Sequence, residues 1–253
     1  MSSDWNPQVL PGWTWPGGPH LEISVYRPRP SDQESILESL HALLGLGAVL
    51  TGVGTTPEPG DDNVSPRRLN IHRSSELDAI VADPARQIRE FYTEGYFESA
   101  SIVSLSPISD QASPTDRRLV DVAFEATDFE IGTDDDKARI GEQAYRLLLE
   151  LARSPEVAYG AIVGEGHWLQ TPSVLADDRS RALFGNFLLT EWVDPADRQL
   201  ILDAFHGAYV EELEFGTYIS THEWLNPGRM PLRDGKQRER SDLVRRMLAK
   251  NLA

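Results

Sequence analysis

Two groups of residues in this sequence could do chemistry. Glu165-Gly166-His167 places an acid and a base two positions apart in a stretch of loop composition, where they could act as a general acid and base. Glu211, Glu212 and Glu214 form a second group, and on a strand Glu212 and Glu214 would share one face, a ledge for Arg and Lys side chains of a partner. Each group also has a simpler explanation, as a surface loop and as a solvated strand face.

The sequence lacks the motifs that indicate a metal site, a nucleotide-binding site or a catalytic nucleophile. The six histidines include no pair at the i, i+4 spacing of a helical zinc site, and His222-Glu223 is not followed by histidine at position 226, which is asparagine. There is no GxSxG elbow, no phosphate-binding GxxxxGK[ST] loop and no cysteine. We therefore expect no metal, no cofactor and no catalytic residue.

Charge is the strongest compositional signal. The 253 residues carry a net charge of −16, and the distribution is uneven. Residues 227–253 contain eight basic and three acidic residues, a local charge of +5, so that the rest of the chain carries −21. Such a field repels phosphate backbones and attracts basic surfaces, which disfavours a nucleic-acid partner and favours a cationic protein. The simpler explanation is that the charge keeps the protein soluble.

The sequence contains no segment suited to a membrane. The longest apolar run, residues 42–53, is interrupted by three glycines and is too short to span a bilayer. The N-terminus lacks the basic and apolar regions of a signal peptide. The absence of cysteine is compatible with a reducing compartment. These features predict a cytoplasmic protein with no membrane partner.

We predict two unequal parts, an N-terminal arm of residues 1–20 and a single α+β domain of residues 21–253. The arm contains Trp5, Trp13 and Trp15 among prolines and glycines, a composition that argues against regular structure. Because tryptophan is costly to expose, the arm is expected to bury its indoles against the domain.

Apolar periodicity and helix-capping signals predict the elements of this domain. Ser31 and Glu34 form a capping box, and Asp194-Pro195 is an N-cap followed by proline at the first helical position. Asp83-Pro84 has the same form, so it predicts a helix reaching residue 92. Strands are predicted at residues 21–26, 48–53, 100–105, 119–126, 157–163, 187–189, 208–215 and 216–221, and further helices at 134–151 and 243–252.

Residues 119–126 indicate how the sheet is covered. Val120, Val122 and Phe124 alternate with Asp121 and Glu125, the pattern of a sheet covered on one face only. The predicted fold is therefore α+β, with a mixed, largely antiparallel sheet and helices packed on one face.

The layout resembles the α+β immunity proteins of bacterial polymorphic toxin systems, the family found beside restriction-endonuclease-fold toxins. The resemblance rests on short motifs and their order along the chain: the opening strand and helix of residues 20–44, Tyr159-Gly160-Ala161-Ile162, the strand after Gly185, and Gly216-Thr217-Tyr218-Ile219 followed by Glu223, Asn226-Pro227 and a final helix.

The resemblance implies a protein without catalysis that binds over the active site of a cognate basic toxin, of nuclease type. For the contact we select acidic residues and one aromatic anchor: Glu211, Glu212, Glu214, Asp128, Glu130 and Trp192. A monomer or weak dimer is expected. Two alternatives remain open at this point, a small-molecule hydrolase or transferase that uses Glu165 and His167, and a scaffold or regulatory subunit.

Overall fold

The fold is described from a computed structural model of the chain. The structure describes residues 20–29, 31–55, 67–71, 74–82, 88–99, 101–105, 119–125, 132–164, 171–177, 183–221 and 235–252. The tryptophan-rich arm up to residue 19 lies outside these ranges, as do Asp128, Glu130, Glu165 and His167.

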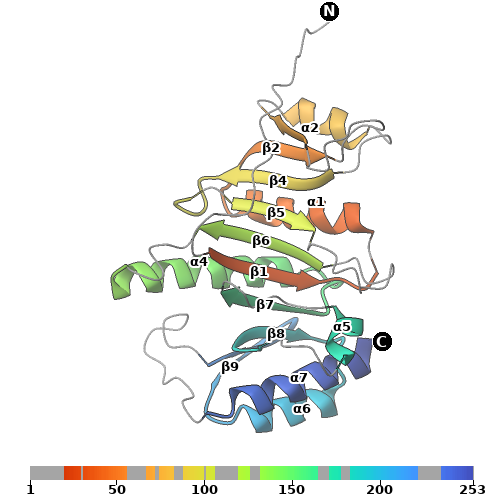
Figure 1. The fold of residues 1–253 in the computed structure, drawn as a ribbon, viewed down its shortest axis with the longest axis vertical. Helices are drawn as coiled ribbons and strands as arrows, with labels where there is room; N and C mark the ends of the chain where they lie inside the picture. Colours follow the sequence, from red (N-terminus) through yellow and green to blue (C-terminus); the bar gives the residue numbers. More distant parts are fainter. Residues whose placement is uncertain are drawn as a thin grey trace, which may run out of the picture.

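The described strands form one sheet (Figure 1). Ten strands lie in the order β3-β2-β4-β5-β6-β1-β7-β8-β10-β9, and every pairing between described strands is antiparallel. In chain order these are β1 (His20–Tyr26), β2 (Val49–Thr55), β3 (Arg67–Asn70), β4 (Ile88–Glu94), β5 (Ser101–Leu105), β6 (Leu119–Glu125), β7 (Tyr159–Gly164), β8 (Asn186–Thr190), β9 (Tyr209–Leu213) and β10 (Gly216–Ser220).

Six helices accompany the sheet in the described part of the chain. They are α1 (Asp32–Gly45), α2 (Ser74–Val81), α4 (Asp134–Ala152), α5 (Pro172–Ala176), α6 (Pro195–Ala204) and α7 (Gln237–Leu252). The predicted α+β class with a largely antiparallel sheet is confirmed. None of these helices is long and apolar enough to cross a bilayer.

Helix starts follow the local capping signals. At α1, the Ser31 side chain accepts a hydrogen bond from the backbone N–H of Glu34 at 3.3 Å, and the Glu34 carboxylate accepts one from the Ser31 N–H at 2.8 Å. At α6, the Asp194 carboxylate accepts from the Ala196 N–H at 2.8 Å, and Pro195 occupies the first helical position. Because each cap uses residues within one helical turn, it can be recognised from sequence.

The helices divide the sheet into two halves. Helices α1 and α4 cover one face of the central strands, where their apolar stripes pack on β1, β4, β5, β6 and β7. Helices α5, α6 and α7 lie on the other face, against the apolar side of β7, β8 and β10. The prediction that the helices pack on one face of the sheet is therefore wrong, because the two helix groups lie on opposite faces (Figure 1). The sequence pattern of any one strand does not specify this division.

Three local predictions are wrong. Residues 88–94 form β4 rather than the end of a helix, because their aromatic and β-branched side chains suit a strand that pairs with β2 on one side and β5 on the other. Residues 164–180 have the composition of a loop, which predicts no helix there, yet helix α5 lies within them. Residues Glu214 and Phe215 form the turn between β9 and β10 rather than the end of the first strand.

Candidate functional site at one end of the sheet

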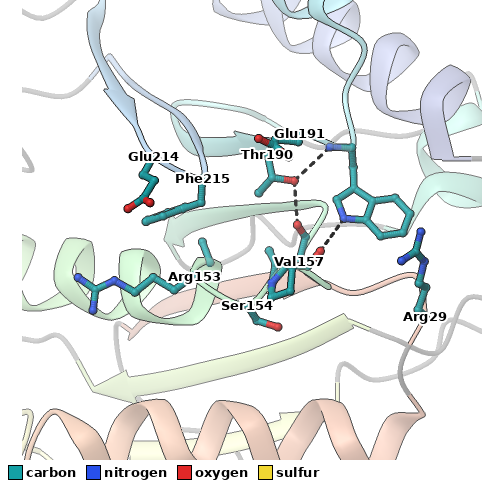
Figure 2. Close-up of a pocket in the computed structure, with 11 residues that line it drawn as sticks. Arg29, Arg153, Ser154, Val157, Thr190, Glu191, Glu214 and Phe215 are labelled. Atoms are coloured by element: carbon teal, nitrogen blue, oxygen red, sulfur yellow. Dashed lines mark hydrogen bonds between the residues drawn. The ribbon is translucent and has the colours of Figure 1, made fainter.

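A pocket of about 490 Å³ opens where several strands end (Figure 2). Four chain segments line it: a residue three positions after the end of β1, the end of α4 with its connection to β7, the end of β8 with the two residues that follow, and the β9–β10 turn. The lining residues are Arg29, Ala152, Arg153, Ser154, Pro155, Val157, Thr190, Glu191, Trp192, Glu214 and Phe215.

Antiparallel pairing brings these distant segments together. The end of β1 lies beside the start of β7, where Tyr26 pairs with Tyr159, and Tyr159 pairs with Leu189 near the end of β8. The start of β10 is the next neighbour, because Gly216 pairs with Thr190. Because neighbouring strands run in opposite directions, the end of one strand lies beside the start of the next. The loops that leave the strands at this end of the sheet form the pocket.

Gly216 fixes the position of the turn that carries Glu214. The turn is a two-residue hairpin loop, since Leu213 pairs with Gly216 across it. A Cβ built on Gly216 would lie 2.3 Å from the Leu189 carbonyl oxygen, a distance that backbone atoms cannot tolerate. Glycine at position 216 therefore lets the hairpin lie directly against β8, which holds Glu214 and Phe215 at the pocket (Figure 2).

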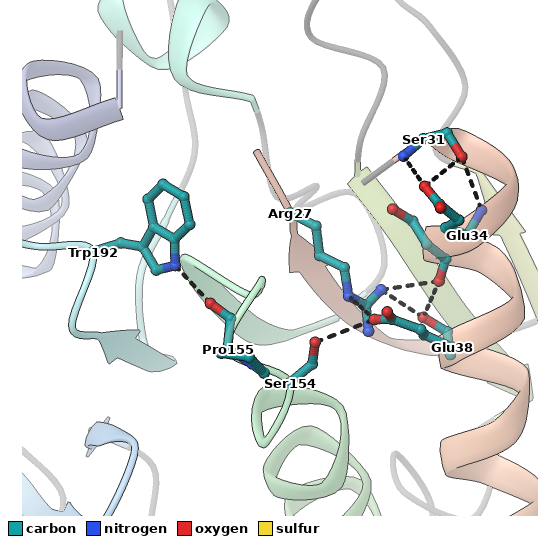
Figure 3. Close-up of polar contacts among 9 residues, drawn as sticks. Arg27, Ser31, Glu34, Glu38, Ser154, Pro155 and Trp192 are labelled. Carbon is teal, nitrogen blue, oxygen red and sulfur yellow. Dashed lines mark hydrogen bonds and ion pairs between the residues drawn. The ribbon is translucent and has the colours of Figure 1, made fainter. Parts of the chain in front are cut away.

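Trp192 is held in place from two sides. Its indole Nε1–H donates a hydrogen bond to the Pro155 carbonyl oxygen at 2.9 Å (Figure 3). The guanidinium of Arg29 lies 4.5 Å from the centre of the indole ring, in cation–π contact. Thr190 secures the strand before it, with its hydroxyl 2.8 Å from the Val157 carbonyl oxygen. The aromatic wall of the pocket is therefore positioned before any ligand arrives.

A buried arginine supports the α4–β7 connection beneath the pocket (Figure 3). Arg27 is 1 % exposed, and its Nη1 donates to the Ser35 carbonyl oxygen at 3.0 Å and to the Ser39 hydroxyl at 2.9 Å. Its Nε lies 3.2 Å from the Glu38 carboxylate, which also accepts from the Ser154 hydroxyl at 3.2 Å. Burial lowers the pKa of Arg27 to about 10, and the Glu38 carboxylate acts in the opposite direction. These contacts join α1, the residue after β1 and the α4–β7 connection.

The charged groups around the pocket differ in whether they already have partners. Arg153 makes an ion pair with Glu150, and Arg29 is stacked on Trp192. Glu191 and Glu214 are both exposed, and neither makes an ion pair or a side-chain hydrogen bond with any residue that the structure describes. The carboxylates of the lining are therefore available to a ligand, while the arginines are engaged.

Two of the sequence-selected residues meet in this pocket. Trp192 and Glu214 both line it, although 22 positions separate them in the chain. Glu191 and Phe215 also line the pocket, but they were not selected from the sequence. Glu191 directly precedes Trp192, and Phe215 directly follows Glu214. The signal that could have found them is their place in the short connections that follow β8 and β9.

The predicted ledge of Glu212 and Glu214 is wrong in its geometry. Glu212 lies in β9, where its carboxylate accepts from the Thr217 hydroxyl at 2.9 Å, whereas Glu214 lies in the turn after the strand. Glu211 points to the α4 side of the sheet and accepts from the Tyr145 hydroxyl at 2.7 Å. The two-residue turn interrupts the alternation that would have aligned Glu212 and Glu214.

A second acidic region lies on the sheet face opposite α1. Glu22 in β1 and Asp121 in β6 are each 3 % exposed, although the alternation in β6 predicted an uncovered face for Asp121. Burial raises the pKa of Glu22 to about 7; the charge of Asp121 adds to this, and the hydrogen bond with His20 at 2.9 Å opposes it. Ser24 pairs with Asp121 in the register of β1 and β6, so this strip of the sheet is polar and buried.

The chemical groups that the pocket presents include carboxylates, an indole, engaged hydroxyls and apolar side chains. In the pocket the two hydroxyls are already engaged, Ser154 with Glu38 and Thr190 with Val157, and its lining among the described residues includes no histidine. Over the part of the chain that the structure describes, no group of three or more His, Asp or Glu side chains could hold a metal ion. The pocket offers two unpaired carboxylates, a fixed indole and an apolar floor.

Comparison with known proteins gives little guidance. No family model matches the chain, and no curated protein is similar to it in sequence. Among solved structures, the T6SS protein PA0821 of Pseudomonas aeruginosa matches with a TM-score of 0.44 and 12 % identity, over 92 % of this chain and 73 % of that one. A likeness at this level carries no argument about function.

Proposed function

We propose that this protein has no turnover of its own and binds a basic protein, a toxin of nuclease type against which it protects the cell. The observation that carries the proposal is the combination of a −16 net charge with a preformed pocket whose carboxylates are unpaired. The layout-level resemblance to immunity proteins of polymorphic toxin systems points in the same direction.

Charge supports the choice of a basic partner. A nuclease presents a positive face to nucleic acid, and an acidic protein can occupy that face while accelerating the encounter. The same field opposes direct binding of nucleic acid by this chain.

The hairpin supports the choice of contact surface. β9 is an edge strand of the sheet, so its outer backbone groups face no further described strand. Its exposed side chains include Val210 and Glu212, and the turn after it exposes Glu214. The hairpin and pocket together give an acidic surface with aromatic anchors, the composition typical of interfaces held by a few buried groups.

The test is a toxicity rescue with the product of the adjacent reading frame. That product, expressed alone from an inducible promoter, should arrest growth, and co-expression of this protein should restore it. The purified pair should form a complex whose dissociation constant rises with salt. A toxic product that this protein neither binds nor neutralises would contradict the proposal, as would an adjacent frame with no toxicity.

Charge reversal sharpens the test of the surface. Glu212→Lys with Glu214→Lys should slow association by about tenfold and flatten its salt dependence, because favourable charges would be replaced by repulsive ones. Glu94→Lys is a matched control, since Glu94 is an exposed acid at the end of the distant strand β4. Glu165→Ala and His167→Ala should leave protection intact; loss of protection in either would favour an enzyme instead.

A further inference from the structure

We propose that the pocket at the end of the sheet receives one arginine side chain of a protein partner, with its guanidinium held between Glu191 and Glu214. This inference rests on the proposed function, because it names the group that the basic partner would insert. It also makes a statement about the isolated protein that can be tested without that partner.

The pocket contains two carboxylates that have no partner among the described residues. Glu191 and Glu214 lie in two different connections and both line the same pocket. Glu191 follows β8 and Glu214 follows β9. Both strands pair with β10, so their ends, and these two residues, lie at the same end of the sheet. A cation placed between two carboxylates that line one pocket can donate a charge-assisted hydrogen bond to each of them.

The cations of the pocket itself do not serve this purpose. Arg153 is paired with Glu150 in the last turns of α4, and Arg29 lies over the Trp192 ring. Neither forms an ion pair with Glu191 or Glu214 in the described part of the chain. Among the described residues, no cation is therefore paired with these two carboxylates, and a cation of a partner can take that place.

The shape and lining favour a guanidinium group over an ammonium group. A pocket of about 490 Å³ accommodates a long side chain, and Val157 and Phe215 offer apolar surface to its methylene groups. A guanidinium carries five N–H donors in a fixed plane, so it can bond two carboxylates at once, while an ammonium acts as a compact point charge. The cation–π contact between Arg29 and Trp192 shows that this aromatic wall already accepts a guanidinium.

The experiment titrates the isolated protein with N-acetyl-arginine amide and follows the Trp192 indole N–H signal in a proton–nitrogen NMR spectrum. The signal is assigned by its loss in Trp192→Phe. Blocked arginine should shift it saturably, whereas blocked citrulline, a neutral molecule of nearly the same shape, should not. Absence of a saturable shift with blocked arginine, or an equal shift with citrulline, would overturn the inference. Equally tight binding of blocked lysine would overturn the preference for guanidinium.

Paired variants locate the site. Glu191→Gln with Glu214→Gln should weaken binding of blocked arginine by about tenfold or more, since two charge-assisted hydrogen bonds are lost. Glu212→Gln is the matched control on the same hairpin, because Glu212 bonds Thr217 and does not line the pocket. Equal weakening by the control would argue against the pocket as the site.

The two proposals fail in different ways. If the toxin binds but the double glutamine variant binds it equally well, the immunity function stands and the pocket assignment is wrong. If blocked arginine binds at Glu191 and Glu214 but the adjacent gene product is neither toxic nor bound, the pocket assignment stands and the immunity function is wrong.

Discussion

Carboxylates gather in two regions of this sheet, on the face that carries Glu22 and Asp121 and at the pocket edge that carries Glu191 and Glu214. The first pair is 3 % exposed at each residue, and the second pair is exposed. In the first region burial raises the pKa of Glu22 to about 7, so the folded protein binds a proton at Glu22 more tightly than the unfolded chain does. At the pocket edge the charge remains hydrated and available to a partner.

The contrast shows that burial, rather than residue type, decides what an acid does in this protein. A buried carboxylate costs free energy when it ionises, so it influences stability and its pH dependence. An exposed carboxylate contributes little to stability, and its effect appears in association with a charged partner.

The strongest test extends the contrast to two arginines that are two positions apart. Arg27→Ala should lower the free energy of unfolding by about 3–5 kcal/mol, because it removes two buried hydrogen bonds from a charged donor, to the Ser35 carbonyl and to the Ser39 hydroxyl, and also the ion pair with Glu38. Arg29→Ala should cost only about 0.5–1 kcal/mol, the value of an exposed cation–π contact. Urea unfolding of both variants measures the difference, and equal costs would contradict the contrast.

Glu22 should make the folded state less stable as the pH rises. Its pKa is raised from 4.5 to about 7 on folding, so the folded protein binds the extra proton, and its contribution to stability is lost as the pH rises from about 4.5 through about 7. The loss amounts to about 3 kcal/mol in total. Glu22→Gln should remove this part of the pH dependence, measured as the difference in unfolding free energy between about pH 5 and about pH 8.

Two further variants test how the neighbours of Glu22 contribute to its pKa. His20→Gln removes the hydrogen-bonded imidazole, which opposes the rise in the pKa of Glu22, so this variant should strengthen the pH dependence. Asp121→Asn removes a charge that raises that pKa, so it should weaken the pH dependence. A pH profile of Glu22→Gln that parallels the unmodified protein would show that Glu22 does not titrate in this range.

The smallest effect on stability is expected at the pocket. Glu191→Gln with Glu214→Gln should change the free energy of unfolding by less than about 0.5 kcal/mol, because both side chains are exposed and neither has a partner among the described residues. Differential scanning calorimetry measures this. A loss of several degrees in melting temperature would mean that these carboxylates have a structural role.

Local sequence signals determined much of the fold. The Ser31–Glu34 capping box and the Asp194-Pro195 start both formed as predicted, because each depends on residues within one turn of helix. The helix predicted at residues 134–151 forms as α4, and the apolar side chains that it buries include Leu147, Leu148 and Leu151. At residues 88–92, for which Asp83-Pro84 predicted a helix, pairing with β2 and β5 gives a strand instead.

The sequence by itself therefore determined the capped helices, most of the strands and a strongly acidic chain. The tertiary structure decided which strand faces are covered and which loops meet. The alternation in β6 predicts that Asp121 lies on the other face of the sheet from Val120 and Val122. That Asp121 is buried there, beside Ser24 of β1, follows only from the assembled sheet. Trp192 and Glu214 share a pocket because β8 and β9 flank β10, an order set by pairing between distant segments rather than by any local pattern.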